Sequence, residues 1–323
     1  MPLHPLLLAE TVVPPLPSQN AMVWIFLAAG VAVLAVLGRF GYLRPSHIVS
    51  PTDPPTARRA GLGAMDYGTV FLALALGVWL VSQIRPAFPQ LFIVQDNGEI
   101  GYRSPWAMGV VMALGQLLTM GPATAVWLWR LHVVNGPDAW RRVGLRVRTL
   151  AADLKLAAIG FLVAVLLTWM AQNAAALVGE WIGSPPAEMV DHVVLKQLIE
   201  AVSTHNHATT ALFIFSAVIL APLLEELLFR GIIQTAVAEM AGPGAPRVEM
   251  RWLAVLVTSV LFVLSHISVG SWHMLAPLFA LSLVLGWLYE RHGRLSLPIF
   301  VHMGFNALNI VLTLLIATAG PGS

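Results

Sequence analysis

Glu225, Glu226 and Arg230 lie inside a long apolar run, Ile214 to Val237. An ionised side chain inside such a run costs several kcal/mol unless it has a partner, so these residues indicate function. Glu226 and Arg230 are four residues apart, share one helix face and can neutralise each other. Glu225 lies about 100° further round the helix, away from that pair. Glu225 is therefore a candidate general base.

Two further polar groups occur on separate apolar stretches. Phe262 and His266 are four residues apart and share a helix face, as do His302 and Asn306. A rise of ~1.5 Å per residue places Glu225 and His266 about 18 and 21 Å from the predicted cytoplasmic ends of their spans. The same rise gives about 9 and 15 Å for His302 and Asn306. Since these depths overlap, we expect the polar side chains to meet.

These residue types suit the addition of water to an amide carbonyl. A carboxylate and an imidazole on separate helices can hold a water between them, with Glu225 as the base that takes its proton. His302 and Asn306 offer N–H groups that can stabilise an oxyanion. Nucleophilic schemes fit less well, because the chain has no cysteine and the serines beside His266 lack a nucleophile-elbow pattern.

A metal ion is the alternative means of activating this water. Glu225, His266 and His302 are the residues that would ligate Zn²⁺ while leaving a fourth position open. The chain has no His-Glu-x-x-His pair, and asparagine is a poor zinc ligand. We therefore favour a reaction without a metal or other cofactor and keep zinc as the alternative.

The composition places these groups in a membrane protein. The chain of 323 residues is 58% hydrophobic and only 11% charged, whereas soluble domains carry about 25% charged residues. A net charge of +2 indicates no nucleic-acid surface. Apolar stretches of about 20 residues cross a bilayer as helices. They predict an all-α, polytopic bundle of about eight transmembrane helices near 21–38, 66–84, 106–129, 156–178, 209–237, 252–270, 274–290 and 296–317.

The distribution of basic residues predicts the orientation in the membrane. Lysine and arginine gather in the loops 39–64, 130–155 and 291–295, whereas 180–208 is net acidic. With both termini outside, each basic loop is cytoplasmic, as the positive-inside rule requires. We expect a multi-pass protein of the plasma membrane. Tryptophans near the span ends, Trp127 among them, are expected to form an interfacial belt.

The chain divides into three predicted parts. Residues 1–20 are rich in proline and lack the basic start of a cleavable signal peptide. Residues 21–135 form a three-helix membrane region of unknown role. Residues 136–320 hold the catalytic core in the C-terminal half, because nearly all polar groups within apolar stretches lie there. His273 is expected at a solvated outer turn.

The three motifs Glu225-Glu226-x-x-x-Arg230, Phe262-x-x-x-His266 and His302-x-x-x-Asn306, in this order, resemble those of the CPBP family. These are the CAAX-protease and bacteriocin-processing (Abi) intramembrane proteases, which include Rce1-type CAAX endopeptidases. The resemblance covers about residues 150–318.

The resemblance implies an all-helical core that cleaves peptide bonds of membrane-associated proteins or peptides. It implies that Glu225 and His266 activate water and that His302 and Asn306 form the oxyanion site. Glu226 and Arg230 would brace the first motif, and we read Phe262 as packing beside the site. The family is often described as metalloproteases, so zinc remains the alternative means of activating the water. A prenylated CAAX protein is the substrate that the eukaryotic relatives suggest, and peptide pheromones and leader peptides stay open.

Two other functions stay open. A catalytically silent scaffold or bacteriocin-immunity protein that binds a peptide would keep its phenotype with Glu225→Gln. A proton-coupled transporter using Glu225 as carrier is disfavoured, because the halves of the chain show no repeat symmetry.

Overall fold

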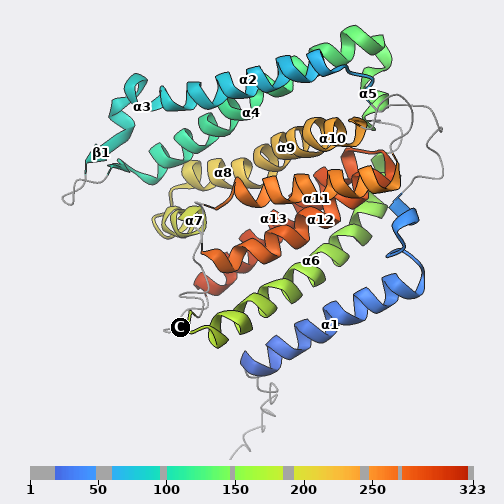
Figure 1. The fold of residues 1–323 in the computed structure, drawn as a ribbon. Coiled ribbons are helices and arrows are strands. Elements are labelled where there is room, and N and C mark those ends of the chain that lie inside the picture. The colour runs from blue at the N-terminus through green and yellow to red at the C-terminus, as the bar shows by residue number, and fades with distance from the viewer. Residues whose placement is uncertain are drawn as a thin grey trace, which may run out of the picture.

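The computed structural model describes residues 19–48, 60–94, 100–145, 150–184, 193–240, 247–267 and 271–318. These residues form a bundle of long helices, which confirms the predicted all-α membrane fold (Figure 1). The long helices are α1 (Gln19–Arg39), α2 (Ala64–Ser82), α4 (Pro105–Asn135), α6 (Leu150–Trp181), a composite helix (His207–Glu239), α11 (Val248–Leu264), α12 (Leu275–His292) and α13 (Ser296–Thr318). The composite helix carries the first motif and is called the motif helix below.

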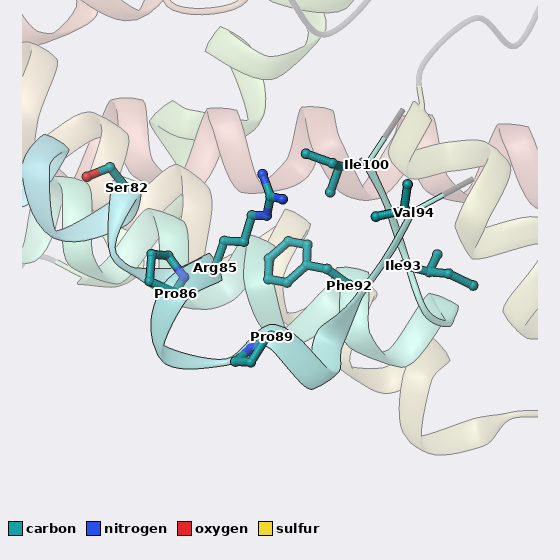
Figure 2. Close-up of a pocket in the computed structure, with 8 residues that line it drawn as sticks. All are labelled: Ser82, Arg85, Pro86, Pro89, Phe92, Ile93, Val94 and Ile100. Carbon is teal, nitrogen blue, oxygen red and sulfur yellow. The ribbon is translucent and has the colours of Figure 1, made fainter. Parts of the chain in front are cut away.

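Short elements connect the long helices. They are η1 (Pro45–Ile48), α3 (Ile84–Ala87), η2 (Pro89–Leu91), β1 (Phe92–Val94), β2 (Ile100–Tyr102), η3 (Gly136–Asp138), α5 (Ala139–Arg142), α7 (Val193–Ser203) and η7 (Trp272–Met274). The strands form an antiparallel hairpin in which Phe92 pairs with Tyr102 and Val94 with Ile100. Figure 2 shows a pocket between the end of α2, α3 and this hairpin. None of its eight lining residues belongs to the three motifs.

Among the described residues, seven helices are long and apolar enough to cross a membrane. They include the predicted span near 274–290, which forms part of the segment Trp272–His292. The exception among the long helices is α11, which has 17 residues and carries Glu249 in its first turn. The sixth predicted span, near 252–270, is therefore shorter than expected, and residues 268–270 lie outside the described residues. The chain is thus an integral, multi-pass membrane protein.

The first three long helices lie on two sides of the bundle (Figure 1). Helix α1 packs against α6, where Phe26 and Trp169 meet edge to face with 4.6 Å between ring centroids. Helices α2 and α4 pair with each other along the opposite edge, beside the motif helix. The domain boundaries given above stay predictions, but α4 directly contacts the helix of the first motif.

Several of the predicted cytoplasmic segments meet at one end of the bundle. The Ala60 N–H donates to the Glu239 carboxylate over 3.1 Å, which joins the start of α2 to the end of the motif helix. The Leu295 N–H donates to the Val143 carbonyl over 3.2 Å. Nδ2 of Asn135 also donates to the Ala60 carbonyl over 2.8 Å. Together these bonds bring parts of the loops 39–64, 130–155 and 291–295 to one end, as the predicted topology requires. The side of the membrane that this end faces stays a prediction.

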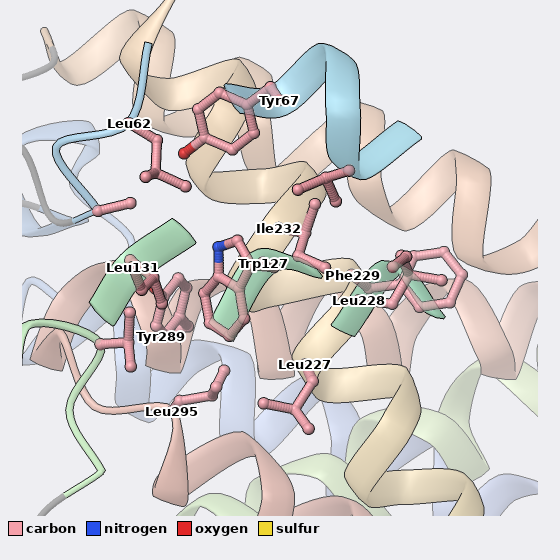
Figure 3. Packing of buried hydrophobic residues seen from close by; sticks show 14 of the residues in the cluster. Leu62, Tyr67, Trp127, Leu131, Leu227, Leu228, Phe229, Ile232, Tyr289 and Leu295 are labelled. Atoms are coloured by element: carbon pink, nitrogen blue, oxygen red, sulfur yellow. The ribbon is translucent and has the colours of Figure 1, made fainter. Parts of the chain in front are cut away.

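The largest apolar cluster surrounds Trp127 on α4 (Figure 3). This indole is 0% exposed, so its predicted place in an interfacial belt is wrong. Its six-membered ring packs against Gly231, where an added Cβ would lie 2.8 Å from the ring. Hydropathy alone does not separate protein-facing from lipid-facing tryptophans, and here the missing side chain of Gly231 creates the space. The cluster holds α4 against the residue that follows Arg230.

Candidate active site

The motif helix changes its winding on both sides of the two glutamates. It consists of α8 (His207–Phe215), the π-helical η5 (Ser216–Leu220), α9 (Ala221–Glu226), the π-helical η6 (Leu227–Gln234) and α10 (Thr235–Glu239). Stretches of π-helix are rare and occur frequently at functional sites. They leave carbonyl groups to other donors, as at Arg230, whose carbonyl accepts a hydrogen bond from the Thr235 hydroxyl over 2.9 Å. Glu225 and Glu226 thus stand on one short α-helical turn between two wider segments.

Glu225 lies between two imidazoles, one just after the end of α11 and the other on α13. Its Oε1 is 3.9 Å from Nε2 of His266, and its Oε2 is 3.8 Å from Nε2 of His302. Both distances exceed the 2.7–3.2 Å of a direct hydrogen bond. Glu225 is 8% exposed, so the group is almost enclosed. A water that lies beside the carboxylate and an imidazole, rather than between them, can contact both groups.

His266 is oriented by the end of its own helix. It stands two residues beyond α11, and its Nδ1 lies 2.7 Å from the Phe262 carbonyl. Because a carbonyl only accepts hydrogen bonds, Nδ1 carries the hydrogen and the neutral ring leaves Nε2 as an acceptor toward Glu225. The Ser265 hydroxyl lies 3.1 Å from the same Nδ1. The short helix α11 thereby presents an acceptor nitrogen to the site.

Phe262 packs among the polar groups, as the sequence suggested. Its ring centroid lies 4.6 Å from that of His266 and 5.9 Å from that of His302. The Arg230 guanidinium lies over the same ring at 5.1 Å, a distance typical of a cation–π contact. Phe229 closes the other side with an edge-to-face contact at 5.1 Å. This aromatic wall holds both imidazoles in place.

Glu226 pairs with Arg230, and it also binds His302. The pair is fully buried, with 3.1 Å between Arg230 Nε and Glu226 Oε2. Glu226 Oε1 lies 2.9 Å from Nδ1 of His302. Because this carboxylate is paired with a guanidinium, it is ionised and accepts the hydrogen of Nδ1. The second nitrogen of His302 therefore faces Glu225.

Helix α12, which carries no motif, completes this arrangement. Arg230 Nη2 donates to the Ser282 hydroxyl over 2.8 Å and to the Ser282 carbonyl over 3.2 Å. One turn further on, Gln234 Nε2 donates to the Gly286 carbonyl over 2.9 Å and to Glu290 over 3.1 Å. Sequence reasoning missed this helix, because a single serine in an apolar stretch is a weak signal. Ser282 and Gly286 are four residues apart, as are Arg230 and Gln234, so the two pairs of partners face each other along the two helices.

Asn306 lies one turn beyond His302 on α13, and its amide binds the motif helix. Its Nδ2 donates to the Ala217 carbonyl over 2.8 Å in the π-helical η5. This bond uses one of its two N–H groups. The structure thus gathers Glu225, His266 and His302, and it ties Asn306 to the helix that carries Glu225. His273, expected in solvent, is buried, and its Nε2 lies 2.9 Å from the Ser184 carbonyl.

The predicted zinc ligands Glu225, His266 and His302 lie close together, but they are spaced more widely than the ligands of a bound zinc. Within the described ranges, no group of three or more histidine, aspartate or glutamate side chains is arranged to hold a metal ion. Two ligands of a tetrahedral zinc with bonds of about 2.0–2.1 Å stand roughly 3.3 Å apart. Glu225 is 3.9 and 3.8 Å from the two imidazole nitrogens. The donor types suit zinc, but the spacing is wider than direct ligation requires.

The comparison with protein families supports the reading of the motifs. Residues 207–308 match the family model described as Type II CAAX prenyl endopeptidase Rce1-like. This segment contains all three motifs, so about a third of the chain is similar to the CAAX-protease family that the motifs resemble. It is shorter than the stretch 150–318 over which we saw the resemblance. The match covers less than half of the chain and supports a protease function of the CAAX type.

Curated relatives match smaller parts of the chain. An "Uncharacterized 24.3 kDa protein" of Escherichia coli is 37% identical over 93 residues, which are 29% of this chain and 40% of that protein. A "Probable multidrug resistance protein NorM" of Rhodopseudomonas palustris is 35% identical over 82 residues, 25% of this chain and 16% of that protein. The chain thus spans less than half the length of either relative. No solved structure matches it.

Proposed function

We propose that the chain is an intramembrane endopeptidase that hydrolyses a peptide bond of a membrane-associated protein or peptide. The observation that carries this proposal is the position of Glu225, 3.9 Å from the His266 imidazole and 3.8 Å from that of His302. A carboxylate that faces two imidazoles without a direct hydrogen bond can bind a water beside them and is suited to general-base catalysis. The Rce1-like segment supports the same class of reaction.

In the proposed reaction, Glu225 takes one proton from the water while the remaining O–H donates a hydrogen bond to Nε2 of His266. The water oxygen adds to the carbonyl carbon of the substrate, and the carbonyl oxygen becomes an oxyanion. The proton held by Glu225 then passes to the leaving nitrogen as the carbon–nitrogen bond breaks. The carboxylic acid that forms then gives the second hydrogen of the water to the amine. The products are a carboxylate and an ammonium group, so atoms and charge balance.

The oxyanion is proposed to lie near His302 and Asn306. Because Nδ1 of His302 already donates to Glu226, a hydrogen on Nε2 makes the ring an imidazolium. Glu226 stabilises this charge, in the manner of the acidic member of a catalytic triad. Asn306 keeps a second N–H after its bond to Ala217. Two such donors are the usual equipment of an oxyanion site.

The substrate is proposed to reach the site from the bilayer. Leu223, Leu264 and Ile267 are exposed apolar residues next to Glu225 or His266 in the chain. In a membrane such side chains face lipid, so a peptide anchored by an apolar group can approach along them. The family description makes a prenylated, CAAX-type protein the first substrate to test.

The experiment is cleavage of a membrane-tethered peptide library by the purified protein in lipid vesicles. Glu225→Gln keeps the shape of the residue and removes the base, so we expect kcat to fall by about 10²–10⁴. We expect His266→Ala and His302→Ala to lower kcat by a similar factor. Glu180→Gln is the matched control, because Glu180 is exposed at the end of α6 and should leave kcat unchanged.

Full activity of the Glu225, His266 and His302 variants would defeat the proposal. A protein that cleaves nothing, and whose cellular phenotype survives Glu225→Gln, would instead be a silent peptide-binding scaffold or immunity protein. Comparing membrane peptides of cells that carry the wild type or Glu225→Gln would identify the natural substrate.

A further inference from the structure

Pro222 stands three residues before Glu225, inside the motif helix. Proline has no backbone N–H and therefore leaves one carbonyl of the preceding turn without its helical donor. In the π-helical η5 the donor lies five residues after the acceptor, as in the bond from the Ala221 N–H to the Ser216 carbonyl. The next bond of this ladder would run from residue 222 to the Ala217 carbonyl. Pro222 cannot make it.

The Ala217 carbonyl receives a hydrogen bond from another helix instead. Nδ2 of Asn306 on α13 donates to it over 2.8 Å. A carbonyl in a water-free environment needs such a partner, because an unpaired polar group there is costly. The bond also fixes which way the carboxamide points, since only its nitrogen can donate to a carbonyl. Because both N–H groups are on this nitrogen, the bond to Ala217 also fixes the direction of the second N–H of Asn306.

We propose that Pro222 is a positioning residue for the proposed hydrolysis, and that it acts by leaving the Ala217 carbonyl free to orient Asn306. This inference rests on the proposed function and deepens it. It links Pro222 on the motif helix to Asn306 in the third motif through the Ala217 carbonyl, without a direct contact between the two side chains. This positioning requires that the helix continues past Pro222. The π-helical η5 leads directly into α9, so the motif helix is not broken at the proline.

The inference predicts the effect of returning the missing N–H. Pro222→Ala supplies a donor that competes with Asn306 for the Ala217 carbonyl. We expect kcat for the tethered peptide to fall about tenfold, less than the 10²–10³ typical of losing an oxyanion donor outright, with KM unchanged. Pro222→Val also supplies the N–H and retains more of the buried volume, so it should have the same effect if packing is not the cause.

A double-mutant cycle isolates the role of Asn306. If Pro222 acts only through Asn306, the variant with both Pro222→Ala and Asn306→Ala should be as active as Asn306→Ala alone. Pro122→Ala is the matched control, because Pro122 also interrupts a membrane helix, α4, and should leave kcat unchanged. Multiplicative losses in the double variant, or full activity of Pro222→Ala and Pro222→Val, would overturn the inference.

A readout without catalysis separates this inference from the proposed function. The side-chain amide protons of Asn306, followed by ¹⁵N–¹H NMR in detergent micelles, should shift in Pro222→Ala and Pro222→Val but not in Pro122→Ala. Unchanged Asn306 signals would overturn the proposed link even if the wild type cleaves peptides. A wild type that cleaves nothing would overturn the proposed hydrolysis and with it the positioning role of Pro222, whatever the NMR signals show.

Discussion

His302 and Glu226 are joined by a hydrogen bond of 2.9 Å, although they lie 76 positions apart in the chain. The same carboxylate binds Arg230, which in turn binds Ser282 on α12. One buried group therefore connects three helices and sets the orientation of the imidazole that faces Glu225. Arg230 neutralises the buried charge of Glu226, but Glu226 also binds His302, a residue of the proposed reaction.

Removing the charge of Glu226 should reduce both stability and cleavage. Glu226→Gln leaves the Arg230 guanidinium buried without a counter-charge, which typically costs about 3–5 kcal/mol of folding free energy. Unfolding in detergent measures this loss. Replacing both residues, as Glu226→Leu with Arg230→Met, should restore much of the stability, since apolar pairs often substitute for buried ion pairs.

Cleavage should stay low in that double variant, because His302 still lacks its carboxylate. A double variant that regains both stability and wild-type kcat would show that Glu226 has only a structural role. Such a result would leave Glu225 as the base of the proposed reaction.

Ser282→Ala should weaken the support of Arg230. A hydrogen bond to a charged group contributes about 1.5–3 kcal/mol, so we expect a loss of that size in the free energy of unfolding. Ser259→Ala on α11 is the matched control. Ser259 is 1% exposed, and its hydroxyl has no hydrogen-bond partner in the part of the chain that the structure describes. Equal losses in the two variants would contradict a specific role for Ser282.

The local features of this site could be predicted from the sequence, and the contacts between helices could not. Eight apolar stretches predicted the eight long helices, because hydrophobic length is set by the bilayer. The spacing of four residues predicted the Glu226–Arg230 pair. No spacing rule indicates that Glu226 also binds His302 or that Ala217 accepts from Asn306, because these bonds depend on how separate helices pack.

Burial shows the same limit of sequence reasoning. Trp127 near the end of a span has the pattern of an interfacial residue, yet it is enclosed by protein. The signal that was available is Gly231, a small residue in the helix that faces it. Small residues let membrane helices approach closely, so such a glycine next to Arg230 indicates a close helix contact there.

The proposed reaction should not depend on a metal ion. In that proposal Glu225 activates the water directly, so cleavage should survive dialysis against strong chelators such as EDTA and 1,10-phenanthroline. The measurement is kcat before and after treatment, together with the metal content of the purified protein. Activity that is lost and is restored only by Zn²⁺ would favour the zinc alternative with Glu225, His266 and His302 as ligands.

Gly231→Ala tests whether α4, in the N-terminal half of the chain, supports the proposed catalytic site. A Cβ at this position would lie 2.8 Å from the Trp127 ring, so the motif helix or α4 must shift. Overpacking of this kind costs about 1–3 kcal/mol of stability, and the shift acts on Arg230, the preceding residue. We therefore expect lower stability in detergent unfolding and lower kcat in vesicles.

The companion variant Trp127→Leu tests the cause of that loss. Combined with Gly231→Ala it should recover part of the lost stability, because the smaller side chain leaves room for the added methyl group. Gly115→Ala is the control on α4, since a Cβ there meets nothing within 4 Å. It should keep wild-type stability and kcat. Equal behaviour of Gly231→Ala and Gly115→Ala would mean that the contact between Trp127 and the motif helix does not support the site.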